Sequence, residues 1–236
     1  MTPQDSSKYE VIRLSVDTII FQMREGGESP ELNVLLVQRR YPPFEGGWAI
    51  PGGFVNKGES LDLAARRELA EETGVKDVYL EQLYTFGEPK RDPRGHVVTV
   101  AYIALLPSDR EVALTAYTDA QDVSWFSMRE LPALAFDHSE ILAYARERLE
   151  NKLEYTTVGF KLLPKKFTLS ELQRVYESVL GKELDKRNFR RKIDLLDILD
   201  PLDEQRKQGA SRPAQLFSLS EVRFTKLRDK GILFPF

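Results

Sequence analysis

The chain contains no cysteine and only two histidines among its 236 residues. The absence of cysteine excludes disulfides, thiolate zinc sites and a cysteine nucleophile, and it fits a reducing compartment. No apolar run approaches the ~20 residues that cross a bilayer. The first residues, MTPQDSSKYEV, lack the basic and apolar regions of a signal peptide. From these absences we expect a cytoplasmic protein with no membrane partner.

The two halves of the chain differ in charge, although the net charge of the whole is only −3. Residues 1–149 contain 16 Lys and Arg against 24 Asp and Glu, a net charge of −8, whereas residues 150–236 contain 18 against 13, a net charge of +5. The length suits one large domain or two small ones. The asymmetry favours two domains, of which the second suits a polyanion.

The stretch Gly53–Val75 begins in a glycine-rich turn, Pro51-Gly52-Gly53, and continues as a helical pattern. The hydroxyl of Ser60 is a candidate N-cap, because it can accept from an unpaired amide of the first turn. Gly74 stands where a left-handed C-terminal cap costs little. The pattern therefore predicts a helix between Ser60 and Gly74.

Three carboxylates crowd one face of this helix. At about 100° per residue, Glu68, Glu71 and Glu72 fall within an arc of roughly 100°. Like charges at i and i+4 cost a few tenths of a kcal/mol, so the face makes sense if a hard cation such as Mg²⁺ lies there. Arg67 can pair with Glu71 or with Glu59 and hold the ligands. The alternative is a solvated acidic helix.

The spacing of this stretch resembles the Nudix box at every defining position: Gly53, five residues, Glu59, seven residues, then RELAEETGV from Arg67. The resemblance implies hydrolysis, dependent on Mg²⁺ or Mn²⁺, of a nucleoside diphosphate linked to another group. It implies that Glu68 and Glu72 bind metal, with help from Glu71 and the carbonyl of Gly53. The catalytic residues that it implies are Glu59, Arg67, Glu71 and Glu72.

Strand and helix signals alternate through the first half, with short connections. A mixed sheet with helices packed on its faces is the architecture expected, an α/β class. The Nudix resemblance implies an α/β/α sandwich in a domain of residues 1–152. Strands are predicted at Glu10–Phe21, Asn33–Gln38, Trp48–Ile50, Val78–Phe86, His96–Leu106 and Val123–Phe126, and a second helix at Asp137–Lys152.

Two arginine-containing loops indicate the substrate. The segments around Val37–Pro51 and Arg91–Tyr102 resemble those of Nudix proteins that handle ADP-ribose. Guanidinium groups also suit a pyrophosphate, although a loop arginine is often only solvated. An adenine can stack on Phe44 or Trp48, and for Trp48 core packing is favoured. The candidate substrate-binding arginines are Arg39, Arg40, Arg91 and Arg94.

His138 is a candidate substrate-site residue that can relay protons near neutral pH. A structural hydrogen bond at the start of a helix is the favoured alternative. Asp137 is a candidate N-cap of that helix. The sequence does not identify the general base, for which Glu140 is an unsupported candidate.

The second half predicts a winged helix over residues 153–236, with a linker at 153–167. Thr168–Leu180 is amphipathic and begins with a capping box between Thr168 and Glu171. Asp185–Leu196 is a second, very basic helix. Two short strands, Ile198–Leu202 and Gln215–Leu219, flank the loop Asp203–Ala214.

A basic second helix is the shape that enters a DNA major groove. This half also resembles the C-terminal domain of the Nudix-related transcriptional regulators, which implies repression of genes of NAD metabolism in response to ADP-ribose. The alternative is a winged helix used for dimer contacts, because acidic residues dilute the wing. Candidate DNA contacts are Lys186, Arg187, Arg190, Arg191, Arg206, Lys207 and Arg212.

Two functions from different classes remain open. The complete box favours an enzyme that cleaves ADP-ribose to AMP and ribose 5-phosphate. The basic helix favours the alternative, a transcriptional repressor that binds double-stranded DNA and senses ADP-ribose. Family resemblance implies a homodimer. The sequence does not separate ADP-ribose from NADH, FAD or other ADP-linked compounds.

Overall fold

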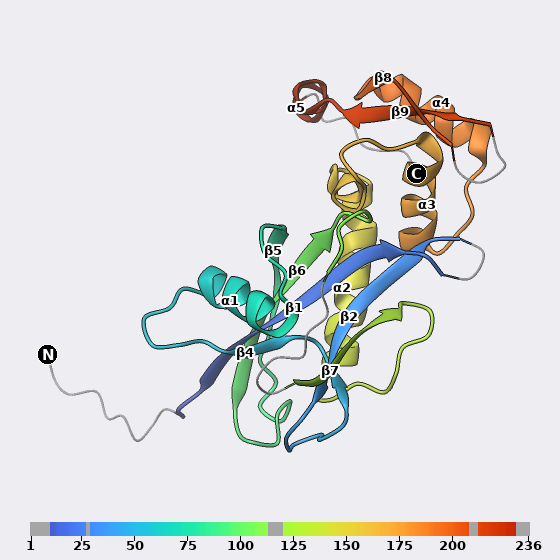
Figure 1. Ribbon diagram of the computed structural model, residues 1–236. Coiled ribbons are helices and arrows are strands. Elements are labelled where there is room, and N and C mark those ends of the chain that lie inside the picture. The colour runs from blue at the N-terminus through green and yellow to red at the C-terminus, as the bar shows by residue number, and fades with distance from the viewer. Residues whose placement is uncertain (1–9, 27–28, 113–119, 208–211, 230–236) are drawn as a thin grey trace, which may run out of the picture.

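The computed structural model describes residues 10–26, 29–112, 120–207 and 212–229. A larger body built around a sheet carries a smaller body formed by the C-terminal part of the chain (Figure 1). Within the described ranges, no helix is long and apolar enough to span a membrane.

The larger sheet has seven strands within the described ranges, in the order β3-β2-β1-β6-β5, with β4 beside β1 and β7 beside β2. Strand β1 is central: it runs antiparallel to β2 and β4 and parallel to β6. The strands are β1 Arg13–Arg24, β2 Glu31–Arg39, β3 Trp48–Ala49, β4 Gly52–Phe54, β5 Tyr79–Phe86, β6 Val97–Leu106 and β7 Ala120–Ser127.

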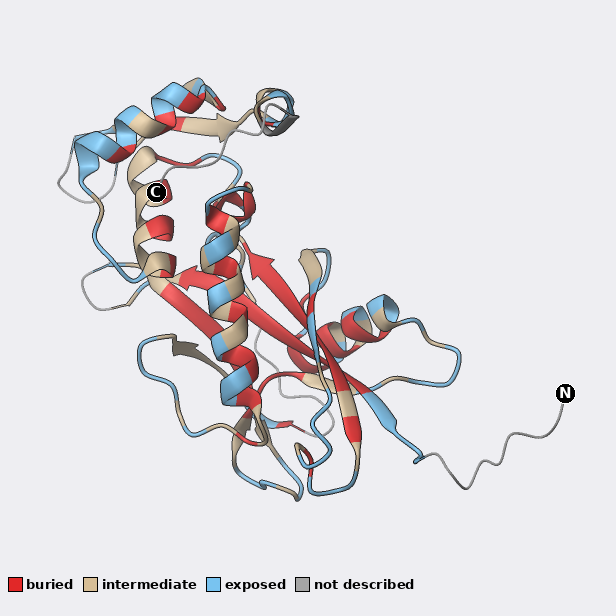
Figure 2. Cartoon of the chain, turned by 180° about the vertical axis from the view of Figure 1, so that it is seen from behind, coloured by how far each residue is buried: buried red, intermediate tan, exposed pale blue. Residues whose placement is uncertain are grey.

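Side chains alternate between the two faces of the sheet, as the period of two requires. Ile19 and Phe21 of β1 pack in the cluster that contains the apolar residues of α2, His138–Leu153. Val16 lies on the other face against Ala64 and Ala65 of α1, Leu61–Thr73. The α/β/α sandwich expected from the sequence is therefore confirmed, and β1 is buried from Ser15 to Met23 (Figure 2).

The C-terminal body is a winged helix. Helix α3 packs against α4, and the antiparallel pair β8–β9 follows. Thr168 and Glu171 form the expected capping box at α3, and Asp185 caps α4 by accepting from the amide of Asn188 at 2.8 Å. The elements are α3 Leu169–Leu180, α4 Lys186–Leu196, β8 Leu199–Arg206, β9 Ala214–Leu219 and α5 Glu221–Asp229.

The two bodies share one apolar core. A 3-10 helix, η2 at Val158–Leu162, is buried between them, so the expected linker is packed rather than exposed. One continuous cluster includes Phe21 of β1, Leu149 of α2, Phe160 of η2 and Tyr176 of α3. The hydroxyl of Ser178 on α3 also accepts from the amide of Leu32 on β2 at 2.7 Å. Helix α2 therefore runs from the sheet to the junction with the winged helix.

Several predicted local features differ from the structure. The turn predicted at residues 51–53 is partly strand, because Gly52–Phe54 pairs with β1. Asp137 precedes α2 but its side chain makes no capping bond, because it binds Arg91 instead. Strand β8 continues to Arg206, so Arg206 does not belong to the wing loop.

Candidate functional site

The candidate site lies where β1 changes partners. Residues 15–17 of β1 pair with β4, whereas residues 20–24 pair with β2. A cavity of about 330 Å³ opens beside this fork. It is lined from both sides of the fork by Asp17, Arg39, Gly52, Gly53, Phe54, Glu68, Glu71, Arg91, Asp92, Arg94, Phe136 and His138, among others.

Two glycines allow β4 to lie close to its neighbours, Gly53 to helix α1 and Gly52 to strand β1. A Cβ on Gly53 would overlap the carboxylate of Glu68, and a Cβ on Gly52 would overlap the carbonyl of Val16. The amide of Gly52 donates to the carboxylate of Glu72 at 2.8 Å. Glu68 and Glu72 are accordingly buried, with 9% and 5% of their surface exposed. The glycines thus bring two carboxylates of α1 against the backbone of the cavity.

Arg67 gathers the other carboxylates of α1. Its guanidinium binds both oxygens of Glu59 at 2.8 and 2.9 Å, Glu68 at 2.6 Å and Glu71 at 3.1 Å. The hydrogen bond from Arg67 and the one from the amide of Asn56 lower the pKa of Glu59 to about 2. The sequence offers Glu59 or Glu71 as the partner of Arg67, and the structure shows that it binds both and Glu68 as well.

The proposed metal ligands on α1 and at Gly53 all offer oxygen atoms, the type that Mg²⁺ and Mn²⁺ prefer. The close contact of Gly53 with Glu68, which leaves no room for a Cβ, also fits a ligand set that includes the backbone there. However, in the part of the chain that the structure describes, no group of three or more His, Asp or Glu side chains is placed to hold a metal ion. Glu68 and Glu71 bind Arg67 instead. The metal-binding residues therefore remain a prediction.

Arg91 lines the cavity, but its guanidinium is bound to acidic side chains rather than presented as an open fork. Its guanidinium makes two bonds to the carboxylate of Asp137, at 2.8 and 2.7 Å, and lies 3.7 Å from Asp17. Only 4% of its side chain is exposed. This bidentate pair fastens the loop at residues 87–96 to the start of α2.

His138 lies at the floor of the cavity, fully buried. Its Nδ1 accepts from the amide of Ile50 at 2.9 Å, which supports the structural role favoured by the sequence. Burial lowers the pKa of His138, while the charges of Asp17 and Asp137 oppose that shift. A neutral ring is what this hydrogen bond requires, because Nδ1 must be an acceptor.

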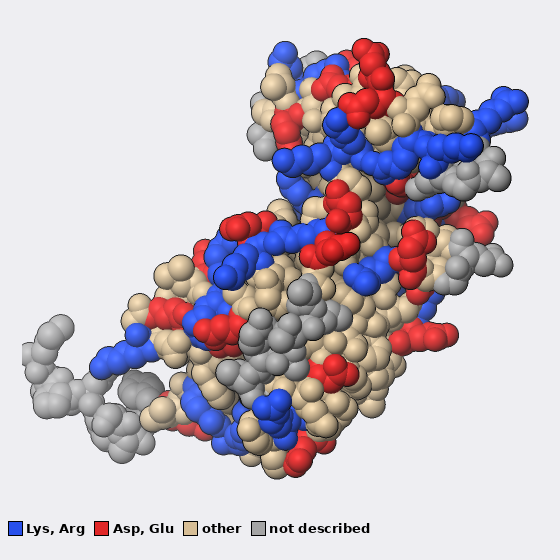
Figure 3. Space-filling view, viewed as in Figure 1, with Lys and Arg blue, Asp and Glu red and all other residues tan. Residues whose placement is uncertain are grey.

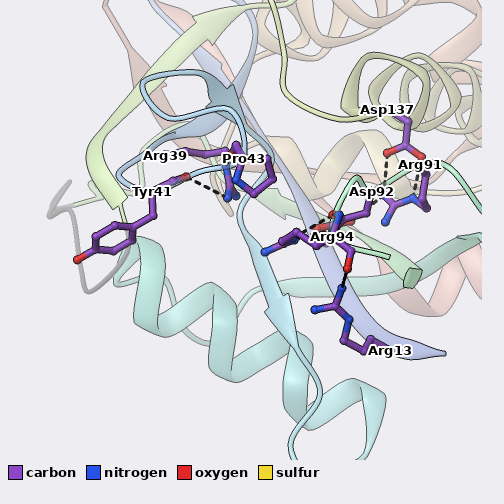
Figure 4. Close-up of polar contacts among 9 residues, drawn as sticks. Arg13, Arg39, Tyr41, Pro43, Arg91, Asp92, Arg94 and Asp137 are labelled. Atoms are coloured by element: carbon purple, nitrogen blue, oxygen red, sulfur yellow. Dashed lines mark hydrogen bonds and ion pairs between the residues drawn. The ribbon is translucent and has the colours of Figure 1, made fainter. Parts of the chain in front are cut away.

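Arg39 ends strand β2 and Arg94 lies in the loop before β6, and both line the cavity. Figure 4 shows the polar contacts that each of them makes. Arg94 binds the carboxylate of Asp92 at 2.7 and 3.0 Å. Burial raises the pKa of Asp92, but the bonds from Arg94 outweigh that effect and hold it below its usual range. Arg39 donates to the carbonyl of Pro43 at 2.8 Å. Arg40 is exposed and is not among the residues that line this cavity.

The two aromatic candidates differ in position. Trp48 packs edge-on against Phe126, with ring centres 4.6 Å apart, which agrees with core packing. Phe44 is 47% exposed and does not line the cavity, but its ring centre lies 4.8 Å from that of Phe136, which does. Both phenylalanines have positive φ, 60° and 54°. Such backbone costs on the order of 1–3 kcal/mol per residue and is common at binding sites.

Sequence reasoning missed Asp17, Asp92 and Phe136 as site residues. Asp17 is one acidic residue within an apolar strand pattern, which is a readable signal. Asp92 lies between Arg91 and Arg94, two candidate substrate-binding residues, and its role follows from its bond to Arg94. Phe136 carries no local signal, because the fold alone brings it to Arg39 and Arg94.

Helix α4 carries the densest group of basic residues in the C-terminal body. Phe189, Ile193 and Leu196 hold this helix in the core. Its opposite side is exposed and carries Lys186, Arg187, Arg190 and Arg191. Lys and Arg side chains also form a band over the smaller body in the space-filling view (Figure 3).

The predicted wing residues differ in what they contact. Lys207 and Arg212 are exposed on either side of the loop. Arg206 instead turns back to the domain junction, where it binds Glu171 at 2.7 Å and the carbonyl of Lys166 at 2.9 Å. This correction removes Arg206 from the surface that the wing presents.

Comparison with known proteins matches both bodies to families. The NUDIX domain matches residues 12–145, and the NrtR DNA-binding winged helix domain matches residues 159–219. The ADPR responsive transcriptional repressor NtrR of Acinetobacter baylyi is 38% identical over 233 residues, 97% of this chain and 88% of that protein. The ADP-ribose pyrophosphatase of Methanocaldococcus jannaschii is 40% identical over 109 residues, 46% of this chain and 63% of that enzyme.

Solved structures give the same picture. Shewanella oneidensis NrtR complexed with a 27mer DNA superposes with a TM-score of 0.73 at 36% identity, covering 94% of this chain and 97% of that one. The NUDIX domain of the same Shewanella protein, complexed with ADP ribose, gives a TM-score of 0.53 at 39% identity, covering 62% of this chain and 94% of that one.

Proposed function

Because the chain belongs to the Nudix family and carries an NrtR-type winged helix, we propose that it is a transcriptional regulator that binds double-stranded DNA and responds to ADP-ribose. The observation that carries this proposal is the likeness to the Acinetobacter repressor, which extends over both domains. The exposed basic side of α4 supports it, since such a helix suits the major groove.

The cavity beside the β1 fork is the proposed ADP-ribose site. Arg39 and Arg94, which line the cavity, offer guanidinium groups to a diphosphate. The buried pair of Arg91 with Asp137 holds the loop that carries Arg94. The sequence placed hydrolysis first, but the comparisons favour regulation.

The test is reciprocal coupling between the two ligands. Saturating ADP-ribose is expected to change the affinity for duplex DNA from upstream of the protein's own gene by at least about fivefold, because allosteric coupling is typically 5–150-fold. Saturating DNA must then change the ADP-ribose affinity by the same factor. Fluorescence anisotropy and calorimetry measure the two quantities. Inorganic phosphate is the control ligand, and identical affinities with and without ADP-ribose would sink the proposal.

Hydrolysis of ADP-ribose is the second candidate, and the complete set of box carboxylates favours it. Glu68, Glu72 and the carbonyl of Gly53 would hold the metal, aided by Glu71. When bound, the metal would neutralise the diphosphate and activate a water. Arg67 would orient Glu68 and Glu71, as it does by direct bonds in this structure.

AMP release from ADP-ribose and Mg²⁺ tests this second activity. Glu72→Gln is expected to reduce the rate at least about tenfold, because it removes a charged oxygen from the proposed metal ligands. Glu147→Gln, an exposed residue of α2, is the matched control. No AMP from the unmutated protein would exclude the hydrolase, and equal rates for both variants would exclude the role of Glu72.

A further inference from the structure

Five side chains from separate segments form an alternating row of guanidinium groups and phenyl rings at the mouth of the cavity. Arg13 and Arg94 lie over the ring of Phe54, at 5.3 and 5.4 Å from its centre. Arg94 and Arg39 lie over the ring of Phe136, at 5.4 and 4.8 Å. All but Arg13 line the cavity. We call this set the stacked row.

Packing alone does not account for Phe136. Its backbone has a φ of 54°, and its ring is only half-buried. Phe44, which meets it edge-on, is also at positive φ and is 47% exposed. Phe136 therefore presents its ring to a polar cavity from a left-handed backbone, which is better explained by a ligand than by the core.

The stacked row has the shape of a base-binding surface. A guanidinium group and a nucleobase are both flat, and both stack on the face of a phenyl ring. The Phe136 ring lines the same cavity as Gly53 and Glu68. A base linked to a diphosphate is a ligand that can contact the ring and the polar residues of this cavity together.

We propose that Phe136 determines specificity by stacking on the nucleobase of a diphosphate-linked ligand. The inference rests on the proposed binding of ADP-ribose. The base takes the place of one guanidinium on the ring, and that guanidinium then becomes available to the diphosphate. Phe44 supports the ring from its edge, so the base end of the ligand is read by residues outside the helix α1.

The test uses the full chain and the fluorescent analogue 1,N6-etheno-ADP-ribose beside ADP-ribose. Phe136→Leu is expected to weaken both ligands roughly 5- to 150-fold, the range of base–aromatic stacking. It must also abolish the quenching of the etheno base in the bound complex. Phe136→Tyr, which keeps the ring, must retain affinity within about threefold and retain the quenching. Phe86→Leu, an aromatic residue of β5 outside the cavity, is the matched control.

Each remaining outcome overturns the inference. Unchanged affinity in Phe136→Leu means that the base does not touch this ring. Weakened binding with full quenching places the stack elsewhere and leaves Phe136 a packing role. Loss of binding in Phe136→Tyr, which keeps the ring, also means that Phe136 has a packing role. The tyrosine variant tests the inference even if the leucine variant does not fold. If the unmutated protein does not bind ADP-ribose, the proposed function fails together with the inference.

Discussion

The Arg91→Ala protein is expected to have a free energy of unfolding about 3–5 kcal/mol lower than the unmutated protein, because the change leaves a buried carboxylate without its partner. Arg91 is 4% exposed and makes two bonds to Asp137, and Asp17 lies 3.7 Å away. The alanine variant lacks the guanidinium group, whose positive charge offsets the negative charges of Asp17 and Asp137. Urea denaturation followed by circular dichroism measures the difference.

Arg129→Ala is the matched control for this prediction. Arg129 is 75% exposed, and its contact with Glu31 is at 3.9 Å. Surface pairs of this kind contribute about 0–1 kcal/mol. A loss below about 1 kcal/mol in Arg91→Ala would contradict the structural role assigned to the pair, whatever its effect on ligand binding.

Loss of two charges from α4 is the second large effect that we expect. The double variant Arg190→Ala, Arg191→Ala is expected to bind duplex DNA roughly 100-fold more weakly, because each lost DNA contact is worth on the order of 1–3 kcal/mol. Both side chains are exposed, while Phe189 and Ile193 keep the helix in place. Fluorescence anisotropy over a range of salt concentrations measures the change.

The salt dependence separates phosphate contacts from a folding defect. If both arginines contact phosphates, the slope of log K against log salt is expected to fall in magnitude by about two. Lys57→Ala, an exposed change in the Nudix domain, is the matched control. A loss of less than threefold, with the slope unchanged, would favour the alternative in which the winged helix serves dimer contacts.

The sequence predicts many of the elements, because their signals are local, but it does not predict which strands pair. The helix from Ser60 to Gly74 was predicted with both caps, since its capping side chain and its left-handed glycine are local features. Strand β4 was taken for a turn, because pairing of Gly52 with Asp17 depends on a distant strand. Capping residues near in sequence therefore determine where a helix ends. Pairing between distant strands determines where β1 changes partners and the cavity forms.

The site residues also fall into two groups, those predictable from local spacing and those brought together only by the fold. Their spacing alone puts Glu68, Glu71 and Glu72 on one helix face, so these residues of the box are predictable from the sequence. Arg91 was predicted as a substrate fork, but its role depends on Asp137, 46 residues away in the chain. Phe136 was missed since only the folded chain brings Arg39 and Arg94 to its ring. The spacing of residues along the sequence does not reveal which charged side chains from different loops will pair.

Helix α2 has one end at the proposed ligand site and the other at the DNA-binding body. His138 and the partner of Arg91 stand at its start, and Leu153 at its end packs against Gly159 of η2. Sixteen residues at about 1.5 Å each make a rod of roughly 24 Å. For the proposed regulator, we expect such a rod to transmit motion. A small tilt imposed where the ligand binds would displace the winged helix without a hinge inside the helix.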